Sequence, residues 1–238
     1  MCSRHHGIQE CKWRKAMKQK QVKTSCWDYL WYALYAFAGL GAELVLLSVF
    51  EPLLFKGIKP ADYSTLQHIV HWMLTILCWA VISLFLVRRS KQKLGFDLLG
   101  HSLPSKQGCI IAALLVAACV TLNALDWQTL KIAGEFQKKG PVLFGFQYLY
   151  YMFEVGLVFL IVAFGQKFAE ELLKKRSNIP FGGVVLCFTW GVIHMLSKGS
   201  LFTGLGVMAF ALCYGFMYVL LNRNAKYSYL AMLFAFII

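Results

Sequence analysis

The chain has 238 residues, of which 59% are hydrophobic and only 15% are charged, and its mean hydropathy is +0.59. A soluble globular domain carries about 25% charged residues, so this composition excludes an ordinary soluble enzyme and indicates a protein of the lipid bilayer. The net charge is +13. Because the basic residues lie between apolar runs, this charge indicates membrane topology and not nucleic-acid binding.

The first 27 residues are basic and polar, and we interpret them as a cytoplasmic tail. Cys2, His5, His6 and Cys11 in this tail do not have the spacing of a zinc site. Six apolar runs follow, each long enough to span a bilayer: 28–50, 65–87, 108–125, 142–166, 181–197 and 201–221. A seventh run, Tyr227–Ile238, would reach only about 18 Å as a helix.

The expected fold is therefore an all-α, polytopic transmembrane helix bundle with six full spans and a short C-terminal hydrophobic helix. Residues 28–238 are expected to form a single transmembrane domain after the tail, because the connections are short and no internal repeat is evident.

Lysine and arginine are distributed unevenly between the runs. With the N-terminus in the cytoplasm, eighteen of the 24 fall on the inner side. The six on the outer side are Lys56, Lys59, Lys131, Lys138, Lys139 and Lys198. The positive-inside rule predicts this orientation for a multi-pass protein of the cell membrane.

Few ionisable or strongly polar side chains fall inside the predicted spans. A charged side chain in hydrocarbon costs about 2.5–3.5 kcal/mol on insertion scales, so each of them needs a partner or a wet cavity. The set consists of Glu43, His68, His71, Asn123, Gln147, Glu154 and His194. We interpret it as a candidate functional site near the outer side, although a lone histidine near a helix end can also bond to a backbone carbonyl.

Several of these side chains recur at spacings of three and four, so they lie on one face of a helix. The three stripes are His68–His71–Thr75–Cys78, Gln147–Tyr151–Glu154 and Cys187–Gly191–His194. Polar groups that faced lipid would lack partners, so the stripes are expected to face the bundle interior, where they can share one cavity. Small residues at Gly204, Ala211 and Gly215 predict close contact between helices.

Two motifs in the region Phe153–Tyr229 resemble the CPBP family, the intramembrane CAAX-processing and bacteriocin-processing proteases also called Abi proteins. Trp190-Gly-Val-Ile-His194 is similar to the family's Phe-x-x-x-His motif, with Trp in place of Phe. Tyr214-Gly215-Phe-Met-Tyr218 is similar to its glycine-bearing helix. The resemblance implies a metal-free intramembrane peptidase without a cofactor, acting on a membrane-associated peptide or prenyl-peptide in contact with the bilayer.

The family's Glu-Glu-x-x-x-Arg motif can be placed at two positions. Glu170-Glu171-Leu-Leu-Lys-Lys-Arg176 has the paired glutamates, but its Arg comes one position late. Glu154 is a single glutamate without a following Arg, yet it lies within a span, as a buried catalytic residue should, and we prefer it. The family's last motif, a His or Asn on the final helix, has no counterpart after Tyr229.

The resemblance and the residue types imply the same roles. Glu154 would be the general base that activates water, and His194 would polarise the carbonyl or orient the water. The candidates for the missing polar group are Glu43, His68 and His71. In an alternative, His68, His71 and His194 would bind a divalent metal, although the more specific H-E-x-x-H pattern is absent.

A non-enzymatic function is the competing interpretation. A catalytically degenerate relative would act as a membrane scaffold or as a partner in peptide export or immunity, and the missing Arg and final His favour this alternative. The similar depth of Glu43, His68, His71 and His194 in the membrane favours an active catalytic site. A transporter is less favoured, because inverted repeats and broken helices in both halves are not evident.

Overall fold

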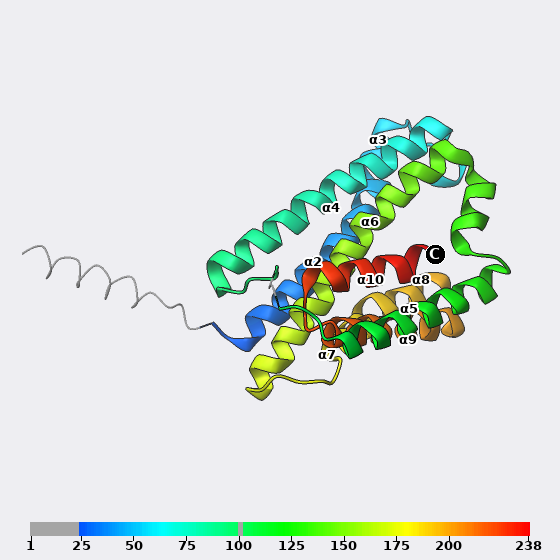
Figure 1. Cartoon of the computed structure of the whole chain (residues 1–238). Helices are drawn as coiled ribbons and strands as arrows, with labels where there is room; N and C mark the ends of the chain where they lie inside the picture. Colours follow the sequence, from blue (N-terminus) through cyan, green and yellow to red (C-terminus); the bar gives the residue numbers. More distant parts are fainter. Residues whose placement is uncertain (1–23, 100–101) are drawn as a thin grey trace, which may run out of the picture.

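The computed structural model describes residues 24–99 and 102–238, and all regular secondary structure in them is helical (Figure 1). Six helical stretches are long and apolar enough to cross a membrane, which confirms the predicted bundle. The first consists of α2 (Cys26–Val45), a π-helical segment (Leu46–Phe50) and α3 (Glu51–Leu54). The next three are α4 (Thr65–Leu94), α5 (Lys106–Trp127) and α6 (Lys131–Leu173). The fifth consists of α7 (Phe181–Leu186), a second π-helical segment (Cys187–Gly191) and α8 (Val192–Lys198), and the sixth is α9 (Leu201–Leu220).

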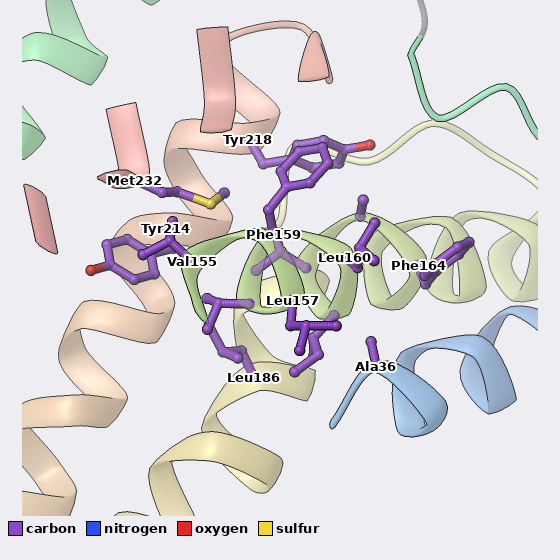
Figure 2. Packing of buried hydrophobic residues seen from close by; sticks show 14 of the residues in the cluster. Ala36, Val155, Leu157, Phe159, Leu160, Phe164, Leu186, Tyr214, Tyr218 and Met232 are labelled. Atoms are coloured by element: carbon purple, nitrogen blue, oxygen red, sulfur yellow. The ribbon is translucent and has the colours of Figure 1, made fainter. Parts of the chain in front are cut away.

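Helix α6 forms the centre of the bundle and packs against α2, α4, α7, α9 and the last helix, α10 (Ala225–Ile237). Its segment 155–166 is apolar except for its last residue, Gln166, and nearly all of it is buried. A helix that is hydrophobic all round is found in a protein core or in a membrane, and here the neighbouring helices cover it. Figure 2 shows Phe159 beside Tyr218, and their ring centroids are 5.9 Å apart.

Three glycines let α7 approach α6 and α9 backbone to backbone. A Cβ on Gly182 would lie 2.1 Å from the carbonyl oxygen of Val162, and one on Gly183 would lie 2.6 Å from that of Ala211. A Cβ on Gly215 would lie 2.6 Å from the backbone nitrogen of Gly183. Side chains do not fit at these distances, so the predicted close contact at Ala211 and Gly215 is confirmed.

Helix α6 is broken near its beginning. Gly140 has a φ of 69°, a value that glycine adopts easily, and Pro141 starts the next helical stretch, where its missing N–H costs nothing. Residues 131–139 therefore form a short helix of their own, set at an angle to the rest of α6 (Figure 1). The predicted spans leave residues 131–139 in a connection between two helices. In the structure this connection is itself helical, and it turns Lys131 toward the bundle.

The C-terminal helix α10 is short, as predicted for the run Tyr227–Ile238, and it packs among α5, α6 and α9. Its last carbonyl groups cannot find partners within the helix. Side chains from α5 and α6 supply them, through bonds from Asn123 to Ala235 (3.2 Å), from Lys131 to Phe236 (2.8 Å) and from Tyr148 to Ile237 (3.0 Å).

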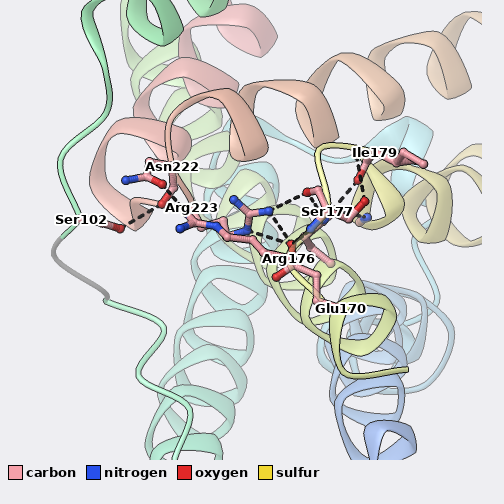
Figure 3. A network of polar contacts seen from close by, with 9 residues as sticks. Ser102, Glu170, Arg176, Ser177, Ile179, Asn222 and Arg223 are labelled. Atoms are coloured by element: carbon pink, nitrogen blue, oxygen red, sulfur yellow. Dashed lines mark hydrogen bonds and ion pairs between the residues drawn. The ribbon is translucent and has the colours of Figure 1, made fainter. Parts of the chain in front are cut away.

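A polar network closes the end of the bundle at which α6 ends and α7 begins (Figure 3). The Nε of Arg223 donates to Oε1 of Glu170 at 3.0 Å, and its Nη2 contacts the same oxygen. The backbone N–H of Ser177 donates to that oxygen at 3.1 Å. Asn222 and Arg223 both have a positive φ, which directs this turn toward the Lys174–Pro180 connection. The network thus joins two connections that are far apart in the sequence.

Candidate functional site

Polar side chains from four helices line a cavity of about 770 Å³ at the opposite end of the bundle, the predicted outer end. The polar lining consists of Asn123, Asp126, Lys131, Lys139, Gln147, Tyr150, Tyr151, Thr203, Glu154 and His194. The apolar lining includes Trp72, Leu122, Phe202, Phe210 and Phe236. A concave, mainly apolar site with a few converging polar groups is typical of ligand sites. We call it the outer cavity.

The structure brings Glu154 and His194 to this one cavity, on α6 and α8 respectively. Trp190 contacts both of them. Its side chain lies close enough to the partly buried Glu154 to interact with it electrostatically, and its carbonyl oxygen accepts a bond of 2.9 Å from Nδ1 of His194. In a neutral His194 this bond leaves Nε2 without a proton and able to accept one. Trp190 therefore lies next to both candidate catalytic side chains and bonds to one of them, His194.

Lys131 is a cavity residue that the sequence did not single out. Its Nζ lies 4.0 Å from the centroid of the Phe236 ring and 4.8 Å from that of Tyr151, at cation–π distances. It is also close enough to Glu154 and Glu135 to interact electrostatically with both. The break at Gly140 explains the omission, because the change of direction there sets the helix 131–139 at an angle to the rest of α6 and Lys131 faces the cavity.

The predicted stripe Gln147–Tyr151–Glu154 faces the outer cavity as expected. Gln147 and Tyr151 also hold the buried carboxylate of Glu135, to which the Tyr151 hydroxyl donates at 2.8 Å and the Gln147 amide at 3.4 Å. Glu135 lies on the short helix 131–139, so these bonds fasten that helix to the main part of α6.

The other predicted polar residues form a separate cluster. His71 lies between two glutamates: its Nε2 is 3.3 Å from Oε1 of Glu43, and its Nδ1 is 2.7 Å from Oε1 of Glu51. The hydroxyl of Tyr63 donates to the other oxygen of Glu51 at 2.9 Å. Glu51 is fully buried, and His71 is nearly so. We call Glu43, Glu51 and His71 the buried triad.

A π-helical segment explains how two glutamates of one helix reach the same imidazole. Glu43 and Glu51 are eight residues apart, which in a regular α-helix leaves them about 80° apart around the axis. The segment Leu46–Phe50 accommodates about one extra residue, so the effective spacing is close to seven and the two carboxylates return to one face. Glu51 lies one residue beyond the predicted span 28–50, and no sequence pattern signals the π-helical segment, so Glu51 was missed.

His68 belongs to neither site. Its Nδ1 bonds to the carbonyl oxygen of Ser64 at 3.1 Å within its own helix, and its ring packs beside Tyr63 and Trp72. The structure does not bring His68, His71 and His194 together. Within residues 24–99 and 102–238, no group of three or more His, Cys, Asp or Glu side chains is arranged to hold a metal ion.

Glu170 and Glu171 lie at the far end of α6 from the outer cavity. Glu171 pairs with Lys167 at 2.5 Å, an i,i+4 ion pair. Glu170 instead pairs with Arg223 in the network of Figure 3. Glu170 therefore helps to join two connections, and Glu154 is the glutamate that shares the outer cavity with His194.

Comparisons with known proteins identified no relative of the chain. No protein-family model, no curated protein and no solved structure matches it.

Proposed function

We propose that this integral membrane protein is a metal-free hydrolase of the peptidase type, which cleaves a membrane-associated peptide in the outer cavity. The observation that carries the proposal is the presence of Glu154 and His194 in one cavity that Trp190 also lines. The motif at Trp190–His194, which resembles that of CPBP proteases, supports the same assignment.

The chemistry requires a base, a water molecule and a group that stabilises negative charge. Glu154 would take the proton of a cavity water, whose oxygen attacks the peptide carbonyl. His194 would orient that water through the free Nε2. Lys131 would stabilise the oxyanion, the role for which the family's final helix supplies a His or Asn that this chain lacks.

The cavity walls agree with a substrate that arrives in the bilayer. Phe202 is 86% exposed and Leu122 53% exposed at the edge of the cavity, on α9 and α5. A peptide with an apolar segment would contact these side chains and place its polar backbone against Glu154 and Lys131.

The direct test compares Glu154→Gln and His194→Ala with the wild type in the native host, by mass spectrometry of membrane and secreted peptides. We expect at least one peptide to accumulate uncleaved in both variants, with a loss of cleavage of about 100-fold or more. Glu171→Gln makes the same chemical change at an exposed ion pair and should leave the peptides unchanged. Normal processing in both cavity variants would contradict the proposal.

The alternative is a binding or scaffolding protein without catalysis, and the predominantly apolar and aromatic cavity wall is the observation that favours it. In that case the purified wild type and Glu154→Gln would retain the same bound molecule in native mass spectrometry. A hydrolase would retain an uncleaved peptide in Glu154→Gln only.

A further inference from the structure

A second, smaller cavity of about 180 Å³ lies at the end of the bundle opposite the outer cavity, at the network of Figure 3. The connection between α4 and α5, helix α6, the connection after α6, and the end of α9 with the turn that follows it all contribute to its wall. We call it the inner pocket. With about 30 Å³ for each molecule of liquid water, it has the volume of about six waters, so a phosphate group fits inside it.

Three cationic and two anionic side chains line the inner pocket. They are Lys167, Arg176 and Arg223, and Asp97 and Glu170. Ion pairs account for four of these five in the part of the chain that the structure describes. Glu170 pairs with Arg223 inside the pocket. Asp97 pairs with Lys91 at 3.1 Å, outside the pocket. Lys167 pairs with Glu171 at 2.5 Å, also outside it.

Arg176 is the remaining cation. It contacts the amide oxygen of Asn222, which is a neutral group (Figure 3). Within residues 24–99 and 102–238, no Asp or Glu forms an ion pair with it. The pocket and the partners of its ion pairs therefore contain four cations and three carboxylates, which leaves one positive charge in excess. A phosphate diester has one negative charge and matches the donor geometry of a guanidinium, so it would neutralise the pocket.

The carboxylate of Glu170 is the acid that faces such an anion most directly, and donors already surround it. Its Oε1 accepts bonds from Nε of Arg223 at 3.0 Å, from the amide of Gln166 at 3.1 Å and from the backbone N–H of Ser177 at 3.1 Å. These bonds compensate its charge, so it opposes a second anion only weakly. Tyr218 lies close enough to Glu170, Arg176 and Arg223 to interact electrostatically with all three. Its hydroxyl can therefore donate to an anion bound at these residues.

Exposed apolar side chains flank the inner pocket on two sides. Leu103 is 74% exposed, and its carbonyl oxygen accepts a bond of 3.1 Å from the pocket residue Asn222. Ile179 is 56% exposed, and its carbonyl oxygen accepts a bond of 3.1 Å from the pocket residue Gln166. A free phosphate ion would leave both side chains without a contact. A phospholipid would place its headgroup in the pocket and its acyl chains against them.

We propose that the inner pocket binds the phosphate diester of an anionic phospholipid from the leaflet at this end of the bundle. Arg176 pairs with the phosphate, the Tyr218 hydroxyl donates a hydrogen bond to it, and Leu103 and Ile179 contact the acyl chains. Basic pockets between transmembrane helices are a recurrent type of site for anionic headgroups. The site is separate from the outer cavity, and a protein without hydrolase activity would contain it as well.

The headgroup is tested by native mass spectrometry of the full chain, released from nanodiscs with equal parts of phosphatidylglycerol and phosphatidylcholine. We expect the wild type to retain phosphatidylglycerol in preference, and Arg176→Gln to retain about tenfold less of it. Lys175→Gln removes the same charge from the next residue, which is exposed and outside the pocket, and should stay within about twofold of the wild type. Equal retention of phosphatidylglycerol in the two variants would overturn the proposal.

The position of the lipid is tested on the wild type, so this test holds even if Arg176→Gln does not fold. The probe is phosphatidylglycerol with a photoreactive diazirine on its headgroup, and the cross-linked peptides are identified by mass spectrometry. We expect cross-links in peptides that contain Ser102, Arg176 or Arg223, and unlabelled phosphatidylglycerol should suppress them. Cross-links that are confined to other parts of the chain would overturn the proposal.

Competition in the same cross-linking experiment distinguishes a lipid from a free phosphate. Glycerophosphoglycerol has the same diester without acyl chains, and inorganic phosphate has neither glycerol nor chains. At the concentration at which unlabelled phosphatidylglycerol suppresses the cross-links, we expect both soluble compounds to leave them unchanged. Equal suppression by either compound would assign the pocket to a soluble phosphate and contradict binding of a phospholipid.

Discussion

The hydroxyl of Tyr150 lies 2.9 Å from Oε2 of Glu43, although the two residues are 107 positions apart in the sequence. This contact joins α2 to α6 where both carry ionisable groups, and it links the buried triad to the outer cavity. Because partners for these groups are scarce in the membrane, the contact also contributes to the stability of the bundle.

The buried triad should stabilise the fold. Glu51→Ala leaves the Nδ1 of His71 and the hydroxyl of Tyr63 without their acceptor, and we expect a loss of about 3 kcal/mol in the free energy of unfolding. Asp62→Ala removes an exposed carboxylate close by and serves as the control. Unfolding in mixed micelles measures both, and equal stabilities of the two variants would show that the triad does not support the fold.

The network at the other end of the bundle should stabilise it through one ion pair. Arg223→Ala leaves the carboxylate of Glu170 without its cation, and the expected loss is about 2–3 kcal/mol. Lys226→Ala removes an exposed cation three residues away and should have almost no effect. Thermal unfolding in detergent compares the stabilities of the two variants. A larger loss of stability in Lys226→Ala than in Arg223→Ala would contradict a stabilising role for the ion pair.

Stability should fall at strongly alkaline pH through Tyr63, which lies between two spans. Its burial and its hydrogen bond to Glu51 raise the pKa of Tyr63 from 10.0 to about 12. The folded protein thus favours the neutral phenol, and the resulting stability is present below pH 10 and is lost as the pH rises to about 12. The difference in melting temperature between the wild type and Tyr63→Phe should shrink over this range; a constant difference would contradict the assignment.

The predicted orientation can be tested by labelling single cysteines with a membrane-impermeant maleimide, in a chain without its native cysteines. Lys59→Cys and Lys175→Cys both introduce an exposed thiol, at opposite ends of the bundle. In intact cells we expect labelling at position 59 only, and labelling at position 175 after permeabilisation. The reverse pattern would place the basic connections outside, against the positive-inside rule.

The sequence predicted the spans well because their hydrophobic runs are long and continuous, and it predicted the stripe on α6 because helical spacing is regular. Of the stripe Cys187–Gly191–His194, only His194 lines the cavity, and the other two residues lie in a π-helical segment. It placed Glu43, His68, His71 and His194 in one cavity, and this was only partly right. The π-helical segment rotates Glu51 onto the face of Glu43, and His71 fills the space between them.

Lys131 and Arg223 show what the sequence does not reveal. Lys131 lies at the cavity because the helix bends at Gly140, and Arg223 meets Glu170 because two distant connections pack together. Both placements depend on tertiary packing, which hydrophobic periodicity does not encode.

The most direct test of the account is whether positions 154 and 194 face one space. In a chain without native cysteines and with a protease site inserted in the 174–176 connection, Glu154→Cys and His194→Cys are combined and treated with a short bifunctional maleimide. We predict that the two halves remain joined after proteolysis, whereas the pair Glu43→Cys and His194→Cys gives separate fragments, because Glu43 does not line the cavity. Separate fragments from the first pair, with each single thiol reactive, would contradict a shared reaction site.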